Sequence, residues 1–273
     1  EHWRRAPLRT PHHSVSVVGV FGGGQPPRPG EISLAHHGVL FLDELPEYRR
    51  AAVEALREPL ETGRITIARG PVSECFPARF LLVAAMNPCP CGYLGDTQRA
   101  CSCTPDQIRR YRARISGPLL DRFDLCVDVR RESGQCVDGW PGTAGENGRR
   151  AGSSESTLTV RRRVEAARRR QLTRQPDCNG RLDLAALDGC LAIAPQASQL
   201  AAQASRRFHW SMRGLHRTLR VARTIADLAG FDTVEPDHVA EAIALRRALE
   251  AEADRLLPAF APTRQGMPAP LGA

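Results

Sequence analysis

The chain has 273 residues, a formal net charge of +8, 42% hydrophobic residues and nine cysteines. This length allows one or two domains with a substantial core. No apolar run approaches ~18 residues and no apolar stretch follows a basic N-terminal segment, so we expect neither a membrane span nor a secretory signal. An odd number of unevenly clustered cysteines does not suit a secreted disulfide framework, which favours a cytoplasmic protein.

The positive charge suits a polyanionic partner such as nucleic acid. All 38 basic residues are arginine, however, and alanine, glycine and proline are abundant. A GC-rich coding bias produces the same composition, so the charge leaves both explanations open.

The first informative element is a strand predicted at residues 39–42. Residues 1–37 are expected to be rich in loops, because prolines and a glycine interrupt residues 26–30. Residues 39–42 then form an apolar run, typical of a strand buried on both faces, and Asp43 and Glu44 follow it directly. Ligands of open α/β sheets bind at the carboxyl ends of the strands, where Asp43 can hold Mg²⁺ and Glu44 can polarise a water for attack on a phosphate. The alternative is that both acids cap the helix that follows.

The sequence contains no G-x-x-x-x-G-K-[ST] phosphate loop, because it contains no lysine. The glycines at residues 22–24 are therefore predicted to form a flexible loop without a phosphate-binding role. Since the chain opens on Glu1, we expect the phosphate-binding strand, loop and helix to lie upstream. This stretch should then bind nucleotide poorly by itself.

Between residues 46 and 129 the pattern predicts alternating helices and strands. A helix is expected over 46–62, closed by Gly63, and a hairpin over 64–80 with basic residues on its outward face. A second buried strand at 80–86, a cysteine loop to about 103, a helix over 105–115 and a last strand over 123–129 complete this region.

Two further polar residues of this region suit phosphate chemistry. Asn87 follows the second buried strand, where a neutral amide can hydrogen-bond both a γ-phosphate and an attacking water; it can equally cap a turn before Pro88. Arg122 can project from the domain towards the phosphates of a neighbouring subunit, or form a salt bridge with Asp121 or Asp124.

Four cysteines form the pattern C-x-C-x₉-C-x-C, with Cys89, Cys91, Cys101 and Cys103 as its members. Four thiolates brought together by one short loop can hold a structural Zn²⁺ in a closed tetrahedral site. A reduced loop with free thiols and a redox disulfide are the alternatives. The histidine pairs at residues 12–13 and 36–37 lack carboxylates at ligand spacing, so we expect them near a nucleotide pocket or a subunit contact.

The remainder of the chain is predicted to be a linker, a helical domain and a tail. Residues 131–157 lack periodicity and are expected to be a flexible linker. Helices are expected at 159–173, 183–190, 195–207, 211–230 and 235–249, within a domain spanning 158–250. The proline-rich residues 251–273 are expected to be a disordered tail.

Six sequence blocks in this order resemble the ComM/YifB group of magnesium-chelatase-like AAA+ ATPases. They are PHH (11–13), GEISLAH (30–36), GVLFLDELPE (38–47), PARFLLVAAMNPCPCG (77–92), SGPLLDRFD (116–124) and RTLRVARTIADLAG (217–230). The resemblance implies an α/β fold: residues 1–130 as the C-terminal part of an AAA+ P-loop NTPase core, with a parallel sheet and a pre-sensor-1 hairpin, followed by an all-α lid. It also implies a hexameric homo-oligomeric ring that hydrolyses ATP with Mg²⁺, and members of the ComM type are associated with DNA branch migration in recombination and natural transformation.

Carried over by position, Asp43 and Glu44 resemble the Walker B pair, and Asn87 resembles sensor 1. Arg122 matches the arginine finger, and Arg213 resembles the sensor 2 arginine that reaches a bound nucleotide from the lid. In the hairpin, Arg64 and Arg69 are then the candidates for contact with a DNA backbone. The missing Walker A segment and a 131–157 stretch longer than expected depart from the family pattern.

Two rival functions stay open. The same ATPase core could drive magnesium insertion for a tetrapyrrole enzyme, in which case DNA would not stimulate hydrolysis. A chain that has lost the phosphate loop could instead be a non-catalytic scaffold held together by zinc.

Overall fold

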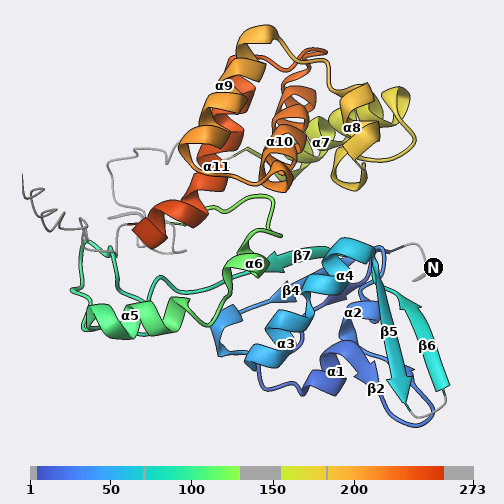
Figure 1. The fold of residues 1–273 in the computed structure, drawn as a ribbon, viewed down its shortest axis with the longest axis vertical. Coiled ribbons are helices and arrows are strands. Elements are labelled where there is room, and N and C mark those ends of the chain that lie inside the picture. Colours follow the sequence, from blue (N-terminus) through green and yellow to red (C-terminus); the bar gives the residue numbers. More distant parts are fainter. Residues whose placement is uncertain (1–4, 70–71, 130–154, 183, 255–273) are drawn as a thin grey trace, which may run out of the picture.

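The computed structural model describes residues 5–69, 72–129, 155–182 and 184–254. Figure 1 shows an α/β part, formed by the first half of the chain, below a bundle of helices formed by the second half. The mixed α/β fold followed by a helical region confirms the predicted fold class. The exact domain boundaries stay predictions.

In the described residues, the main sheet of the α/β part has three parallel strands in the order β1-β4-β7. They are β1 (Leu8–Arg9), β4 (Val39–Leu42) and β7 (Leu81–Ala84). β4 lies in the middle, and its pairing with β7 runs from Val39 opposite Leu81 to Leu42 opposite Ala84. The carboxyl ends of β4 and β7 therefore meet at one edge of the sheet.

Burial differs between the two faces of these strands. In β4, Leu40 and Leu42 are buried while the alternate residues are only half-buried. In β7, Leu81 is 61% exposed and Val83 39% exposed. The prediction of strands buried on both faces was wrong in this respect, because in the described chain the core covers one face of the sheet more fully than the other.

The prediction of a strand over residues 123–129 is wrong. This segment belongs to no sheet in the described chain. The backbone N–H of Cys126 instead donates to the carbonyl of Leu245, at 3.0 Å, in the last helix that the structure describes. A strand exists only where a partner offers a free edge, and here a helix supplies the hydrogen bond.

Residues 5–37 contain more structure than expected. They form α1 (Val17–Phe21), α2 (Glu31–Leu34) and a two-stranded ribbon of β2 (Gly22–Gly23) and β3 (Arg28–Pro29). Gly22 has φ +99°, and a Cβ there would lie 2.3 Å from the carbonyl oxygen of Arg28. Gly22, which was predicted to lie in a flexible loop, is therefore needed for the close approach of the two strands of this ribbon.

The predicted helix over 46–62 is divided into three pieces. A 3-10 helix (Leu45–Glu47) precedes α3 (Arg50–Ala55) and α4 (Arg57–Thr62). Gly63 ends α4 with φ +67°, as predicted, since a residue without Cβ adopts this conformation most easily. The predicted hairpin is confirmed as β5 (Arg64–Arg69) and β6 (Val72–Pro77).

Two helices complete the α/β part. α5 (Pro105–Arg112) begins with a capping box between Thr104 and Gln107, and α6 (Gly117–Leu120) is capped by Ser116. The main core of this part gathers around Leu40, Leu42 and Leu56.

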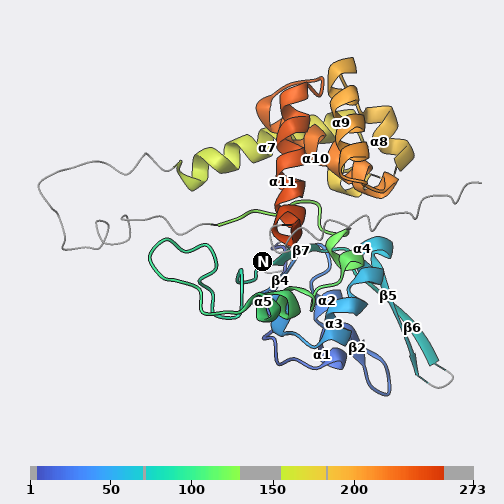
Figure 2. The same ribbon diagram turned by 60° about the vertical axis from the view of Figure 1, so that its left-hand side comes forward.

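The helical part consists of five α-helices in the described residues. They are α7 (Thr157–Arg174), α8 (Leu184–Cys190), α9 (Pro195–Arg207), α10 (Met212–Ala229) and α11 (Pro236–Asp254). α9, α10 and α11 pack around a core of small side chains such as Ala201, Ala222 and Ala226. In Figures 1 and 2, α11 runs from the bundle towards the α/β part.

The predicted linker lies outside the described residues except for 155–157. The predicted tail does so as well from residue 255 onward, whereas α11 continues to Asp254, beyond its predicted end. None of the helices in the described ranges is long and apolar enough to cross a membrane.

Candidate functional site

The predicted acid pair and the predicted amide lie at the same edge of the sheet. Asp43 and Glu44 follow β4, and Asn87 stands three residues after the end of β7. The two segments are tied together, because Ala85 donates to the carbonyl of Leu42 at 2.9 Å and Leu45 donates to the carbonyl of Ala85 at 3.0 Å. All three polar side chains are exposed and so are open to a ligand.

Glu44 has an unusual backbone conformation, with φ +51° and ψ +47°. This left-handed conformation is uncommon for a residue with a Cβ and clusters at functional sites. The backbone N–H of Glu44 donates to an Asp43 carboxylate oxygen at 2.9 Å. The Asp43 carboxylate therefore caps the turn in which Glu44 stands.

A histidine from the first loop approaches Glu44. Nδ1 of His13 lies 3.1 Å from a Glu44 carboxylate oxygen, and the two side chains are 34% and 49% exposed. The ring of Tyr48 packs edge-on against His13, and the Tyr48 hydroxyl donates to the carbonyl of Pro11 at 2.5 Å. The sequence pointed to a role for the histidine pair near a pocket, but nothing local in it indicated the contact with Glu44.

Arg122 does not project into solvent. Its side chain is 12% exposed, and one of its terminal nitrogens lies 2.9 Å from Glu61. Its Nε donates to the carbonyl of Arg57 at 3.2 Å, and another nitrogen donates to the carbonyl of Pro118. The structure therefore shows the guanidinium folded against α4 and α6; the predicted salt bridge with Asp121 or Asp124 is replaced by one with Glu61.

Arg213 stands in the first turn of α10 and contacts the same carboxylate. Its Nη1 donates to Oε1 of Glu61 at 2.5 Å, although its side chain is 69% exposed. Nearby, Arg217 donates to the carbonyl of Arg122 at 2.6 Å and to Asp124 at 3.0 Å. Arginines on α10 thus join the helical part to the α/β part. No sequence motif indicated Glu61 as the common partner of Arg122 and Arg213.

The structure describes the side chain of Arg64 in the hairpin but only the backbone of Arg69. Arg64 is exposed and lies at the base of the hairpin, where its backbone bonds Thr62. The backbone of Arg69 pairs with Val72 near the tip, while its side chain lies outside the described residues. The hairpin itself stands out from the α/β part in both views (Figures 1 and 2).

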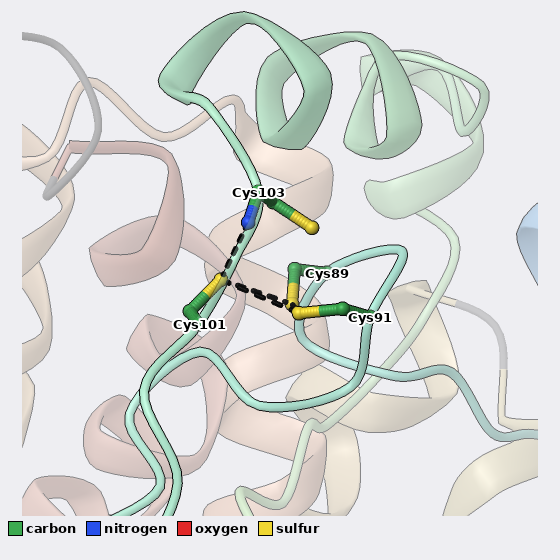
Figure 3. A group of neighbouring side chains, drawn as sticks. All are labelled: Cys89, Cys91, Cys101 and Cys103. Carbon is green, nitrogen blue, oxygen red and sulfur yellow. Dashed lines mark hydrogen bonds between the residues drawn. The ribbon is translucent and has the colours of Figure 1, made fainter.

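The four cysteines of the loop between β7 and α5 come together (Figure 3). One sulfur from each of Cys89, Cys91, Cys101 and Cys103 lies within 4.8 Å of the others. The Sγ atoms of Cys89, Cys91 and Cys101 are 3.4 to 3.6 Å apart, and no disulfide joins them. In a tetrahedral zinc site with Zn–S bonds of about 2.3 Å, sulfurs lie about 3.8 Å apart, so this group fits such an ion.

The pKa values of these thiols are shifted in opposite directions. A hydrogen bond from the backbone of Tyr93 is the main reason that the pKa of Cys91 falls to about 5. The backbone of Cys103 favours the thiolate of Cys101, but burial and the neighbouring sulfurs raise the pKa of Cys101 to about 12. In the described part of the chain no other group of three or more His, Cys, Asp or Glu side chains could share a metal.

Next to the cysteine loop, Arg112 of α5 donates twice to the carbonyl of Pro88, at 2.9 and 3.1 Å. This contact and the capped start of α5 fix both ends of the loop. The cysteine cluster therefore lies beside the end of β7, adjacent to Asn87.

A parallel sheet with polar residues at one edge, followed by a helical region whose arginines contact the α/β part, is consistent with a magnesium-chelatase-like AAA+ fold. The family model "Magnesium chelatase, subunit ChlI" matches residues 1–137, and "Magnesium chelatase, subunit ChlI C-terminal" matches residues 154–246. The chain belongs to this magnesium chelatase ChlI family.

Individual relatives agree with the family assignment. The chain is 43% identical over 257 residues to YifB of Escherichia coli and 42% identical over 245 residues to the competence protein ComM of Haemophilus influenzae. Each match covers 90% of this chain and 46% of the relative, so the chain spans less than half the length of these curated proteins. The magnesium-chelatase 38 kDa subunit of Acidiphilium rubrum is 28% identical over 102 residues, which are 37% of this chain and 23% of that protein.

Proposed function

We propose that this chain forms part of a cytoplasmic, ATP-hydrolysing AAA+ ring motor of the ComM/YifB type that acts on DNA. The observation that carries the proposal is the acid pair Asp43 and Glu44 at the carboxyl end of the central strand, with Asn87 at the neighbouring strand end. The phosphate loop would be supplied by sequence outside this chain. Without that loop, the chain should hydrolyse little ATP by itself.

In this proposal each residue at the sheet edge has one role. Asp43 would hold Mg²⁺ through a carboxylate oxygen, and the ion would neutralise charge on the phosphates of bound ATP. Glu44 would accept a hydrogen bond from the attacking water and orient it, while Asn87 would donate to a phosphate oxygen without adding negative charge. The exposure of all three side chains leaves them accessible to these partners.

The arginines would complete the site from a second subunit. The acceptors of Arg122 named above lie on α4 and α6, and neither Asp43 nor Glu44 is among them. Arg122 and Arg213 would therefore serve the ATP of a neighbouring copy, as in a closed ring, which we propose to be hexameric. Developing negative charge on the phosphates would be stabilised by both guanidiniums.

The cysteine cluster is proposed to hold a structural Zn²⁺. Four thiolates leave no open coordination position, so the ion would fix the loop beside Asn87 and would take no part in hydrolysis. The spacing of the sulfurs supports this assignment over a disulfide, whose sulfur atoms would lie about 2.05 Å apart.

Contact with DNA is proposed for the hairpin of β5 and β6, with Arg64 and Arg69 as candidate residues. The phosphate backbone of DNA attracts positively charged side chains regardless of base sequence, which suits a motor that moves along DNA. The name of the Haemophilus relative, competence protein ComM, supports a role connected with DNA uptake, and we extend it to this chain only as part of the proposal.

Magnesium insertion for a tetrapyrrole enzyme is the second candidate, favoured by the family description and by the match to the magnesium-chelatase subunit of Acidiphilium rubrum. That match covers 37% of the chain, against 90% for YifB and ComM. Stimulation of ATP hydrolysis by DNA separates the two candidates. A scaffold without catalysis would show no hydrolysis in the complete protein under either condition.

The proposal is tested by Glu44→Gln in the complete protein. Because glutamine keeps the size of the side chain but cannot act as a base, turnover should fall by about 10²-fold or more while ATP binding persists. Asp106→Asn, at an exposed position in the first turn of α5, is a matched charge control and should retain turnover. Normal turnover by Glu44→Gln would remove Glu44 from the proposed role.

A further inference from the structure

One carboxylate oxygen of Glu61 contacts arginines from both parts of the molecule. Oε1 of Glu61, in the last turn of α4, lies 2.9 Å from a terminal nitrogen of Arg122 and 2.5 Å from one of Arg213. The contact with Arg213 links residues 152 positions apart in sequence. Two guanidinium groups from different parts of the fold therefore converge on one anionic atom.

This arrangement has the features of an anion site that is already filled. Arg122 is fixed before it meets the anion, because the backbone carbonyls of Arg57 and Pro118 take its other nitrogens and its side chain is only 12% exposed. Converging guanidinium groups recognise carboxylate and phosphate oxygens by the same charge-assisted hydrogen bonds. Glu61 occupies the position that a phosphate oxygen would take.

The bound carboxylate is also one that can be displaced. Glu61 is 32% exposed and Arg213 is 69% exposed, so an anion from solvent can reach the pair. A negative charge in the last turn of a helix is disfavoured by the helix dipole, whereas the first turn of α10, where Arg213 stands, favours an anion. A phosphate group carries more charge than a carboxylate and can therefore compete for both arginines.

We propose that Arg122 and Arg213 form an oligophosphate-binding site that Glu61 fills as an internal ligand, so that a phosphate group binds there only by displacing Glu61. The site itself is a property of this chain. Only the identification of its physiological ligand as ATP held by a neighbouring subunit rests on the proposed function. In that setting Glu61 is a positioning residue: it holds the two arginines together until the phosphates arrive.

The test uses tripolyphosphate and the 273-residue chain in isothermal titration calorimetry, so that it needs neither ATP hydrolysis nor a ring. Removing the competing charge in Glu61→Gln should tighten binding by about fivefold or more relative to the unmodified chain. Glu58→Gln removes the same charge from an exposed position one turn earlier on α4 and should leave the affinity unchanged within about twofold. Adding Arg213→Gln to Glu61→Gln should abolish the gain.

The proposal is overturned if Glu61→Gln binds no more tightly than Glu58→Gln, or if its gain survives Arg213→Gln. Circular dichroism checks that each variant is folded. If Glu61→Gln does not fold, Glu61→Asp, which keeps the charge but withdraws it by one methylene, should show a smaller gain over Glu58→Gln, and no gain would refute the site. Normal turnover by Glu44→Gln together with tighter tripolyphosphate binding by Glu61→Gln would reject the ATPase mechanism and keep this site. Lost turnover by Glu44→Gln without tighter binding by Glu61→Gln would keep the ATPase mechanism and reject this site.

Discussion

Asp227 of α10 lies at the centre of a buried hydrogen-bond network in the helical part. Its side chain is fully buried, and it accepts four hydrogen bonds at 2.8 to 3.0 Å. Arg174 donates two of these, one to each oxygen, and Asn179 and Arg223 donate one each. The side chain of Arg223 is itself fully buried, so Asp227 is the anion that compensates its charge.

We predict that Asp227→Asn destabilises the helical part by about 3–5 kcal/mol, the usual cost of removing one partner of a buried ion pair. The amide would place an N–H₂ group against donors that now face an oxygen, and it would leave Arg223 without a compensating charge. The matched control is Asp232→Asn, which removes the partner of Arg170 from a side chain that is 95% exposed and should cost no more than about 1 kcal/mol.

Urea unfolding followed by far-ultraviolet circular dichroism measures both costs, and its pH dependence supplies a second test. Burial alone would raise the pKa of Asp227, but hydrogen bonds from Arg174 and Asn179 and the charge of Arg223 hold it below the ordinary value. A lowered pKa in the folded state gives stability that is complete above the unfolded pKa of about 3.9 and is lost as pH falls through the lower folded pKa. The difference between the unmodified chain and Asp227→Asn should therefore be full at neutral pH and shrink below pH ~4. Equal costs for the two variants at neutral pH would refute this reasoning.

Two other predictions follow from the geometry. The purified chain should contain one zinc ion, measured by elemental analysis. Cys101→Ser should lose this ion and Cys75→Ser should retain it, because Cys75 is exposed and lies outside the cluster. Equal zinc content in both variants would contradict the site. In the helical part, Gly230→Ala should cost about 1 kcal/mol because Gly230 ends α10 with φ +85°, whereas Gly189→Ala, in open space on α8, should stabilise by about 0.5–1 kcal/mol. Thermal unfolding of the two variants checks the opposite signs, and shifts in the same direction would contradict the assignment of the cap.

The elements that local patterns define were predicted well. The apolar run at Val39–Leu42 became the central strand, and the helices of the second half follow their capping residues, such as Ser211 and Gly230 at the two ends of α10. The spacing of the four cysteines predicted their convergence, because a short loop can bring two close pairs together. These signals act within a few residues and are therefore present in the sequence.

The features that were missed depend on contacts between distant segments. The apolar alternation of residues 123–129 is typical of a strand, but strand formation needs a free edge, and the helical part supplied a partner through Leu245 instead. Glu61 carries no local sign of its role, since its partners Arg122 and Arg213 arrive from separate parts of the chain. The contact of His13 with Glu44 likewise arises only because β1 lies beside β4.

The most direct test of the central claim is subunit mixing of two inactive variants of the complete protein. Glu44→Gln should disable the acid pair of one subunit, and Arg122→Ala should remove the arginine that the neighbouring subunit supplies. If the ATP site lies between subunits, co-expressing the two variants in equal amounts should restore about one quarter of the ATPase activity in the presence of four-way-junction DNA, because that share of random interfaces is intact. Mixed rings as inactive as either variant alone would contradict an intersubunit site formed by these residues.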